Sequence, residues 1–420
     1  MIKDNIYIVD AIAGSGKSTA IINMINNCTS EKRFLYVTPF LKEVERIIEE
    51  CPKKNFIQPD KKTRSKKGDI YKLISKGNNI VTTHALFQSF TPEIKELIYQ
   101  QDYTLVLDEV CNVVENVAIS KHDLKNILES FAHVNDDNLI EWDVNDYNGK
   151  FDNYKTMADN KSLLVYQDAA LMWKFPIEVF RAFEKVYILT YMFDCQMQKY
   201  YYDYYGVIYN YLSVKHNVND KGIIDRKSYA LSTLSEAILP EYTKTLKNNI
   251  NIVDNDKINS VGESITRSQP LSASWFKRQT DHGADDMVLI DKLKSHLYNY
   301  FRNIAKGNST DNMWTTFKSH KQLLSGNGYT KGFVALGARA TNQYMHKKNL
   351  AYCANIFINP ILKQFFALKD IKINESKYAL SELVQWAWRS QISLGEPITI
   401  YIPSYRMRTL FIEWINEFNE

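Results

Sequence analysis

Short apolar runs alternate with longer polar stretches through the first half of the chain. The apolar runs have the length and the Ile, Val and Leu content of buried strands, and the stretches between them have the spacing of amphipathic helices. Regular alternation of this kind predicts a parallel sheet covered by helices, which is an α/β fold. The expected strands are Ile6–Val9, Phe34–Thr38, Ile80–Thr82, Leu105–Leu107 and Val186–Leu189.

The pattern weakens between residues 215 and 286, where Asn, Asp, Lys and Ser are common, and then resumes. We therefore predict a first α/β domain over residues 1–214, an irregular linker or insertion over 215–286, and a second α/β domain over 287–420. The elements expected in the second domain are helices at 287–305, 380–392 and 410–418, strands at 313–317, 332–336 and 398–402, and a strand or helix at 351–358.

Composition narrows the class of protein. The 420 residues are 45% hydrophobic and 24% charged, which are values of an ordinary globular protein rather than a fibrous or disordered one. The net charge of +4 means that any surface for a polyanion is a local patch. The five cysteines are scattered without a C-x-x-C pair, so neither a zinc site nor a disulfide framework is expected. Because no apolar run has membrane length, we expect a soluble, cytoplasmic protein without a membrane partner.

The strongest chemical signal is the run AIAGSGKST at residues 11–19, which follows the first expected strand and precedes a helical stretch. A glycine-rich loop in this position binds phosphate, because its amides point at phosphate oxygens and the helix adds its positive N-terminal end. Lys17 is expected on the β- and γ-phosphates and Ser18 on Mg²⁺. The predicted nucleotide-binding residues are Ala13, Gly14, Ser15, Gly16, Lys17, Ser18 and Thr19.

A second signal follows the expected strand Leu105–Leu107, which ends at the acidic pair Asp108-Glu109. The carboxyl ends of parallel strands meet at one edge of a sheet, so this pair, the phosphate loop and Thr190 are expected to lie together. Asp108 is predicted to hold Mg²⁺, and Glu109 to position and deprotonate an attacking water. The pair therefore indicates hydrolysis of a nucleoside triphosphate rather than binding alone.

With further segments in the same order, the chain resembles a superfamily 2 DExx-type helicase, notably the compact helicases of phage replication modules. Residues 11–18 resemble helicase motif I, and the segment Leu107–Val110 resembles motif II. The remaining segments are Tyr36–Glu43 for motif Ia, Val81–Leu86 for the Thr-His element before motif II, Leu189–Phe193 for motif III, Trp314–Lys318 for motif IV, Ala338–Asn342 for motif V and Gln385–Arg389 for motif VI.

The resemblance implies two tandem RecA-like parallel-sheet P-loop NTPase domains that bind ATP and Mg²⁺ and act on a single strand of nucleic acid. The catalytic residues that it implies are Lys17, Glu109, Gln385 and Arg389. Thr190 would couple the nucleotide state to the strand. The nucleic-acid contacts that it implies are Thr38, Pro39, Thr83, His84, Thr316 and Thr341. The expected activity is ATP-dependent translocation or unwinding in phage-type DNA replication, on DNA rather than RNA, with replication proteins as partners in a host cytoplasm.

Two departures from the helicase pattern leave alternatives open. Motif VI in the family carries a second arginine three residues after the first, where this chain has Ile392. The arginine finger is then Arg389, Arg406 or Arg408. The few residues before the phosphate loop leave no room for the glutamine motif that reads adenine in many relatives. A small-molecule kinase that uses the same loop and a catalytically inactive ATP-binding regulator are the alternative functions.

Two unusual stretches have simpler interpretations. The basic run Lys61–Lys67 is expected to be a solvated loop, with contact to a nucleic-acid backbone as the alternative. The tyrosine-rich run Tyr200–Tyr205 is expected to be a helix whose rings turn into the domain interior, rather than a platform for stacked bases.

Overall fold

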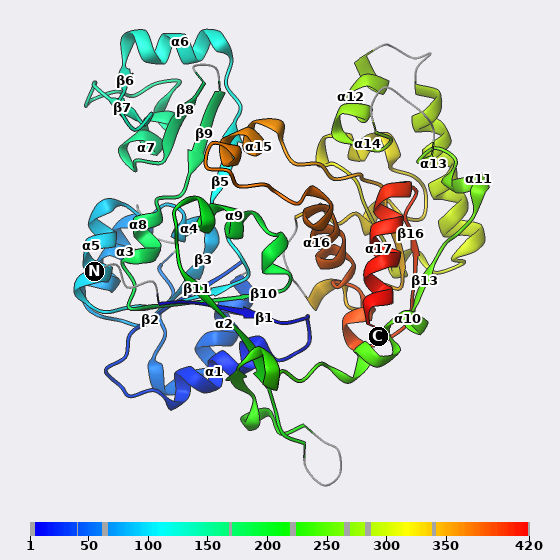
Figure 1. Ribbon diagram of the computed structural model, residues 1–420, viewed down its shortest axis with the longest axis horizontal. Helices are drawn as coiled ribbons and strands as arrows, with labels where there is room; N and C mark the ends of the chain where they lie inside the picture. The colour runs from blue at the N-terminus through cyan, green and yellow to red at the C-terminus, as the bar shows by residue number, and fades with distance from the viewer. Residues whose placement is uncertain are drawn as a thin grey trace. The chain divides into compact units, whose positions relative to one another are not determined.

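The computed structural model describes residues 5–39, 41–60, 66–167, 170–218, 224–263, 269–281, 287–337 and 342–418 (Figure 1). The chain divides into two compact units. Unit 1 comprises Met1–Ile238 and Asn359–Ile373, and unit 2 comprises Leu239–Ile358 and Asn374–Glu420. Each unit has a parallel sheet with helices packed against it, which confirms the predicted α/β class.

Unit 1 is built on a sheet of β1 (Ile6–Asp10), β2 (Phe34–Thr38), β3 (Ile80–Thr83), β4 (Thr104–Asp108), β10 (Lys185–Thr190), β11 (Tyr209–Lys215) and β12 (Ala230–Ser232). Their order is β12-β11-β1-β10-β4-β2-β3, and all neighbouring pairs are parallel except β11 and β12. β10 lies between β1 and β4, with Asp10 opposite Thr190 and Leu189 opposite Asp108. The carboxyl ends of the three strands therefore align at one edge.

Helices cover both faces of this sheet because successive strand residues point to opposite sides. Leu105 and Leu107 of β4 are buried in one core cluster, and Val106 between them is buried in another. The first cluster is shared with α3 (Lys66–Ser75), α4 (His84–Phe87), α5 (Pro92–Gln100), α8 (Ile177–Arg181) and α9 (Met197–Tyr204), and the second with α1 (Lys17–Asn27) and α2 (Leu41–Glu50). Figure 1 shows the two sets on opposite sides of the strands. The five strands predicted for the first half of the chain are all present.

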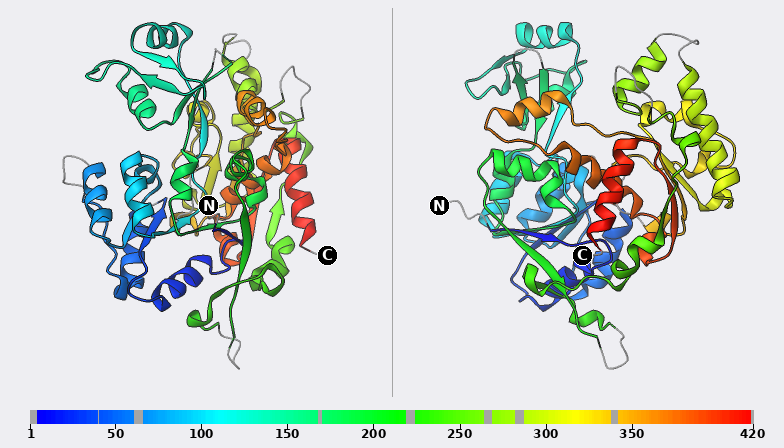
Figure 2. Two further views of the ribbon diagram at one scale, coloured as in Figure 1. Left: turned by 60° about the vertical axis from the view of Figure 1, so that its left-hand side comes forward. Right: turned by 45° about the vertical axis from the view of Figure 1, so that its right-hand side comes forward.

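A smaller lobe is inserted between β4 and β10. It consists of β5 (Val114–Val117), α6 (Lys121–Ser130), β6 (Ala132–Val134), β7 (Ile140–Trp142), α7 (Asp152–Asp159), β8 (Leu163–Tyr166) and β9 (Ala170–Lys174). Antiparallel pairing joins β5, β9 and β8, and β6 pairs with β7. Leu124, Ile127 and Leu163 belong to a buried core of its own. Figures 1 and 2 show this insertion as a distinct lobe of unit 1.

The tyrosine-rich run forms an inward-facing helix, as predicted. Tyr200, Tyr201 and Tyr202 of α9 are 3%, 1% and 0% exposed. A second helix, α15 (Pro360–Ala367), packs against α9 although most of the sequence around it belongs to unit 2. The Tyr204 and Phe365 rings stack with a centroid distance of 4.5 Å. The tyrosine-rich run therefore packs in the core of unit 1 and also contacts α15.

Unit 2 is built on a parallel sheet of β13 (Ile250–Ile252), β14 (Asn312–Thr315), β15 (Asn349–Tyr352) and β16 (Ile398–Tyr401), in the order β13-β16-β15-β14. One core cluster joins Trp314 and Tyr401 to α11 (Asp256–Asn259), α12 (Ala273–Asp281) and α13 (Val288–Asn299). Tyr352 contacts Trp386 of α16 (Glu375–Ala387), which packs against α17 (Tyr405–Glu417). The shorter elements are α10 (Leu246–Asn249), α14 (Lys321–Leu324) and a π-helical turn, η7 (Tyr300–Ile304), that continues α13.

Two predictions for the second half differ from the structure. Residues 332–336 are described but form no strand, since a single bridge joins Phe333 to Trp314 after a 3₁₀ turn. An added Cβ at Gly332 would lie 2.3 Å from the Asn312 carbonyl oxygen, so the backbone approaches β14 closely, but its pairing with β14 is limited to that one parallel bridge. The expected linker at 215–286 contains β13, which pairs with β16, and the unit boundary lies at Ile238. The weak pattern there reflects a short strand and short helices.

Some predicted features lie outside the described residues. These are residues 61–65 of the basic run, Phe40, and residues 338–341 of the segment resembling motif V, Thr341 included. Within the described ranges, no helix combines the length and the apolar character needed to cross a membrane.

Candidate nucleotide site

The phosphate loop joins β1 to α1 and is shaped by two glycines. Gly14 and Gly16 adopt φ angles of 79° and 84°, in the left-handed region that favours glycine. Lys17 turns back over the loop, and its Nζ donates to the carbonyl oxygens of Ala11 at 2.5 Å and Ile12 at 3.2 Å. The ammonium group therefore lies within the loop, where a lysine of this motif meets phosphate oxygens.

The side chain of Ser18 meets that of Asp108 across the sheet edge. Ser18 Oγ donates to Asp108 Oδ1 at 3.5 Å. The two residues meet although β10 lies between β1, which leads into the loop, and β4, which ends at Asp108. Tyr36, in β2, donates its hydroxyl to Asp108 Oδ2 at 3.3 Å. The structure thus brings together the two residues that the sequence predicts for Mg²⁺, and it adds a tyrosine that the sequence analysis missed.

Glu109 leaves β4 in a strained backbone conformation. Its φ is 75°, a left-handed value that is uncommon for a residue with a side chain. The Glu109 N–H donates to the Leu189 carbonyl of β10 at 2.9 Å, and His84 Nε2 lies 3.2 Å from the Asp108 carbonyl oxygen. Strain of this kind persists only where the surroundings enforce it, and it is frequent at catalytic positions.

Burial and mutual repulsion set the charges of the site. Burial raises the pKa of Asp108 to about 6, and the neighbouring Glu109 adds to that shift. Burial also raises the pKa of Asp10, although two backbone N–H donors oppose the change. The pKa of Lys17 is lowered by burial, against the attraction of the three carboxylates. Three acids around one lysine leave negative charge that a divalent cation would neutralise.

Asp10 is a residue of this site that the sequence analysis missed. Its carboxylate accepts hydrogen bonds from the N–H groups of Met192 and Phe193, both at 2.9 Å. The Thr190 carbonyl accepts the N–H of Ala11 at 3.0 Å. The start of the phosphate loop is therefore bonded to the segment that follows β10. The sequence feature that could have identified Asp10 is its place at the last position of a buried strand, directly before the phosphate loop.

Thr190, predicted to couple the nucleotide to the strand, is fully buried at the end of β10. Its hydroxyl donates to Gln196 Oε1 at 3.0 Å, and the Gln196 amide donates to the Tyr191 carbonyl at 2.8 Å. The Thr190 side chain therefore reaches the segment that Asp10 also binds, and not the phosphate loop itself.

The residues of this site fit a nucleoside triphosphate with Mg²⁺. Ser15 is 4% exposed, and its hydroxyl has no hydrogen-bond partner in the part of the chain that the structure describes. A buried hydroxyl in that state, inside a phosphate loop, suits an oxygen-rich ligand. Ser18 and Asp108 supply hard oxygen donors, and Mg²⁺ in proteins is commonly held by one or two such groups together with phosphates and water.

The residues predicted to contact nucleic acid occupy different environments. Thr38 and Thr83 are register partners at the ends of β2 and β3, but Thr38 is fully buried, whereas Thr83 and Pro39 are partly exposed. His84 is buried against the backbone of the acidic strand end. Thr316, which directly follows β14 in unit 2, is also fully buried. Among the members of the set that the structure describes, Pro39 and Thr83 are the accessible ones.

The segment resembling motif VI lies in α16 and just beyond it. Gln385 is partly exposed, and Arg389 is 6% exposed. Ile392, which stands where the family has its second arginine, is 0% exposed. It is a core residue of unit 2, and a charged side chain there would be buried.

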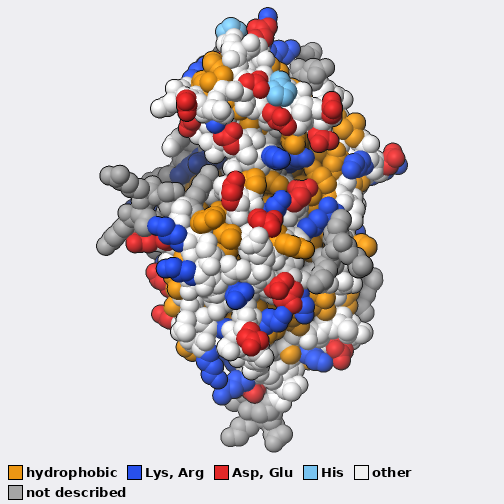
Figure 3. All heavy atoms as spheres, turned by 90° about the vertical axis from the view of Figure 1, so that its left-hand side faces the viewer, with side chains coloured by type: hydrophobic (Ala, Val, Ile, Leu, Met, Phe, Trp, Pro, Cys, Tyr) orange, Lys and Arg blue, Asp and Glu red, His pale blue; other side chains and the backbone are white. Residues whose placement is uncertain are grey.

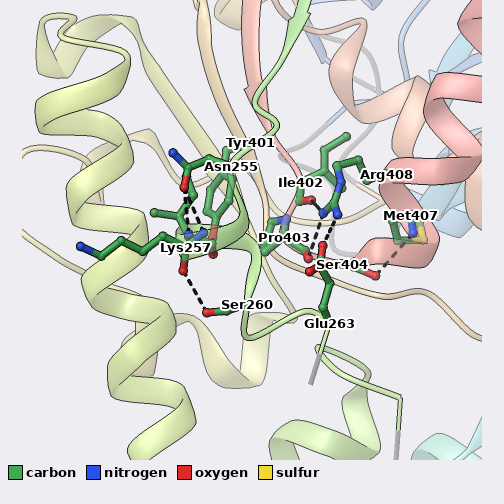
Figure 4. Close-up of polar contacts among 11 residues, drawn as sticks. Asn255, Lys257, Ser260, Glu263, Tyr401, Ile402, Pro403, Ser404, Met407 and Arg408 are labelled. Atoms are coloured by element: carbon green, nitrogen blue, oxygen red, sulfur yellow. Dashed lines mark hydrogen bonds and ion pairs between the residues drawn. The ribbon is translucent and has the colours of Figure 1, made fainter. Parts of the chain in front are cut away.

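The two other arginines considered for the finger are engaged within unit 2. Arg408 is 6% exposed, donates to two main-chain carbonyls at 3.0 and 3.3 Å and pairs with Glu263 (Figure 4). Arg406 donates to the Asn355 side chain at 2.9 Å and to a neighbouring carbonyl at 2.8 Å. Both guanidinium groups hold loops of the unit.

Charge on the visible face of unit 1 is mixed. Figure 3 shows Lys and Arg side chains interspersed with Asp and Glu over the described part of this face. The inserted lobe, residues 114–173, has eleven Asp and Glu residues against five Lys. An acidic lobe repels a polyanion, so it is a poor candidate for the nucleic-acid surface.

Comparison with known proteins finds a relative along the whole chain. The SPbeta prophage-derived uncharacterized protein YonV of Bacillus subtilis (strain 168) is 40% identical over 426 residues, which cover 98% of this chain and 99% of that protein. The chain belongs to the YonV family. The family model of the YonV middle domain matches residues 114–173, which is the inserted lobe. The model of the YonV C-terminal Rossmann-like domain matches residues 244–415, which include the sheet of unit 2.

Solved structures similar to this YonV-family chain include helicases. An apo structure of XPD matches over 99% of this chain and 96% of its own, at 13% identity and a TM-score of 0.49. The helicase MrfA bound to DNA and AMPPNP matches over 99% of this chain and 48% of its own, at 12% identity and a TM-score of 0.34. Likeness at these values bears on neither activity nor substrate.

Proposed function

We propose that this YonV-family protein is an ATP-dependent motor on nucleic acid, a translocase or helicase whose track is single-stranded DNA. The observation that supports it most is the contact of Ser18 Oγ with Asp108 Oδ1 at 3.5 Å, beside the Lys17 ammonium. In P-loop NTPases, a loop serine and an acid at the end of a second strand hold Mg²⁺, and Ser18 and Asp108 would hold it here. A phosphate loop alone serves many binding proteins, whereas a loop serine that meets the acid of a second strand favours hydrolysis.

The position of each residue in the site suggests a role in ATP binding or hydrolysis. The loop amides and Lys17 would bind the phosphates, and Ser18 and Asp108 would hold Mg²⁺, which neutralises phosphate charge when bound. Glu109, fixed at the strand end, would orient the attacking water and accept its proton. Arg389 is assigned to the charge that develops on the γ-phosphate.

Asp10 and Thr190 provide the connection from the nucleotide to the rest of unit 1. Both bind the segment after β10, Asp10 through its carboxylate and Thr190 through its hydroxyl partner Gln196. A shift of the phosphate loop on binding or hydrolysis would move that segment, because β1 and the segment share hydrogen bonds. The DNA track and a setting in phage-type replication follow from the motif resemblance.

The deciding experiment is ATP hydrolysis by the purified protein with single-stranded DNA, single-stranded RNA, duplex DNA or no polymer. We expect strong stimulation by single-stranded DNA. Glu109→Gln should retain ATP binding and lower the stimulated kcat by about 10²–10⁴-fold, because it removes the proton acceptor. Glu129→Gln is the matched control, since Glu129 is exposed on α6 of the inserted lobe. Turnover that no polymer changes would contradict the motor.

The alternatives make different predictions in the same assay. A small-molecule kinase would hydrolyse ATP slowly whichever polymer is present and would consume it rapidly only when a substrate with an acceptor hydroxyl group is added. An inactive regulator would bind ATP without turnover; the main reason to expect one was Ile392. Because Ile392 is a buried core residue, the missing arginine at that position is accounted for by packing.

A further inference from the structure

The ring of Tyr229 lies directly against the phosphate loop. An added Cβ at Gly16 would lie 2.2 Å from Tyr229 Cε1 and 2.4 Å from its Cδ1. The ring edge fills that space, so residue 16 must be glycine for this contact as well as for its φ of 84°. The proposed hydrolysis makes no use of the ring.

A hairpin anchored to α1 fixes the position of Tyr229. The residue directly precedes β12, the edge strand that pairs antiparallel with β11. Asn23 of α1 donates its side-chain amide to the carbonyl oxygens of Arg226 at 3.0 Å and Tyr229 at 2.9 Å. The Tyr229 side chain also packs against the core cluster that contains α1. The ring is thus positioned by the fold before any ligand binds.

A second ring lies beside it at the same edge of the sheet. His216 directly follows β11, and its ring centroid lies 4.9 Å from that of Tyr229. Because β11 runs parallel to β1 and next to it, His216 leaves the sheet at the edge that carries the phosphate loop. His216 Nδ1 is buried and, within the described ranges, has no hydrogen-bond partner. A buried ring nitrogen in this state suits a ligand that can hydrogen-bond to it.

We propose that the His216–Tyr229 pair binds the base of the nucleoside triphosphate whose phosphates occupy the loop. The inference rests on the proposed ATP site, since the loop determines where the phosphate end of the ligand lies. Every base has an aromatic face, so stacking supplies affinity with little selectivity among bases. His216 and Tyr229 lie at the ends of β11 and β12, beside the strand that leads into the loop, and their rings can supply this contact with the base.

The test compares two ligands that share phosphates but differ in the base. Binding of ATP and of inorganic tripolyphosphate, each with Mg²⁺, is measured by calorimetry. Tyr229→Ala should weaken ATP binding about tenfold and change tripolyphosphate binding by less than about twofold. Tyr229→Leu, which keeps apolar bulk without the aromatic face, should lose most of the same affinity, and Tyr229→Phe should retain it. Tyr99→Ala, at a tyrosine of α5 that is 66% exposed, is the matched control.

Each other outcome contradicts the proposal in a distinct way. Equal losses for ATP and tripolyphosphate would mean that the ring only shapes the loop. Tighter binding of both ligands by Tyr229→Ala would make the ring an obstruction. Unchanged ATP binding in the Ala and Leu variants would remove the base contact while leaving the phosphate site intact. Failure of the wild-type protein to bind either ligand would overturn the ATP site itself, and the base site with it.

Discussion

Unit 1 and unit 2 both bring polar side chains close to the carboxyl ends of parallel strands, but these side chains contact different groups. In unit 1, Ser18 and Tyr36 meet the carboxylate of Asp108 at 3.5 and 3.3 Å. In unit 2, Asn355 and Arg408 donate to main-chain carbonyls at 3.1 and 3.0 Å, and each also contacts a side chain of the same unit, Arg406 for Asn355 and Glu263 for Arg408. The hydroxyl donors around Asp108 leave its negative charge in place for a ligand, whereas side chains bonded to main-chain carbonyls fix loops. The comparison supports the proposal that the phosphate chemistry lies in unit 1, whereas Asn355 and Arg408 of unit 2 serve the fold.

Arg389 tests this comparison most strongly, because we assign it to catalysis although it lies in unit 2. Arg389→Ala should lower the DNA-stimulated kcat by about 10³-fold or more, the range for removing an arginine finger. ATP affinity should change little, since we assign most of the phosphate contacts to the loop and Lys17. Steady-state hydrolysis and calorimetry measure the two effects, with the exposed Arg302→Ala as control. Full turnover in Arg389→Ala would leave unit 2 without the arginine that we assign.

Replacing Arg408 should lower the stability of unit 2 rather than the rate of ATP hydrolysis. Its guanidinium is buried among two carbonyl oxygens and Glu263, so Arg408→Met should destabilise unit 2 by about 2–3 kcal/mol. ATP binding by unit 1 should be unaffected. Urea denaturation with and without ATP separates the units, because ATP raises only the transition of the unit that binds it. A large loss of kcat with unchanged stability would make Arg408 the finger and would contradict the comparison.

The features that could be predicted are those that a short, continuous stretch of sequence specifies. The strands of the first half and the phosphate loop depend on local runs, and Asp108 follows from the rule that strand ends meet at one edge. Asp10 bonds to Met192, 182 residues away, and no local pattern indicates that partner. Tyr229 is brought to Gly16 by the pairing of β11 with β12 and by the hydrogen bond from Asn23, neither of which a local pattern indicates. The strands of the inserted lobe are short apolar runs like those of the main sheet. The sequence pattern alone therefore did not reveal where the lobe begins and ends.

Protonation of Asp108 offers a smaller test within unit 1. Burial raises the pKa of Asp108 to about 6, above the value of about 3.9 for an unfolded chain. The ionised group therefore destabilises the metal-free fold above pH 6, and this penalty fades as the pH falls through 6 towards 4. In EDTA at pH 7.5, Asp108→Asn should stabilise unit 1 by about 1–2 kcal/mol after allowance for its partial exposure. The difference from the wild type should shrink at pH 5.

Thermal denaturation at the two pH values measures this effect. An equal gain at both would mean that the amide repacks the site and that charge is not the cause. With Mg²⁺ present, the same variant should lose ATP hydrolysis, because the amide is a poorer ligand for a hard cation.

Lys369 gives the smallest expected effect and tests how α15 is held in unit 1. Its Nζ donates to the Tyr204 carbonyl at 3.0 Å and lies 4.3 Å from the Tyr204 ring centroid. The residue is exposed, so Lys369→Met should lower the stability of unit 1 by less than about 1 kcal/mol. Phe366→Ala, at a fully buried residue of the same segment, should cost about 3–5 kcal/mol. Both shifts should appear in the transition that ATP raises. A larger loss from Lys369→Met than from Phe366→Ala would mean that a polar clamp, and not the aromatic core, attaches this segment to the nucleotide-binding unit.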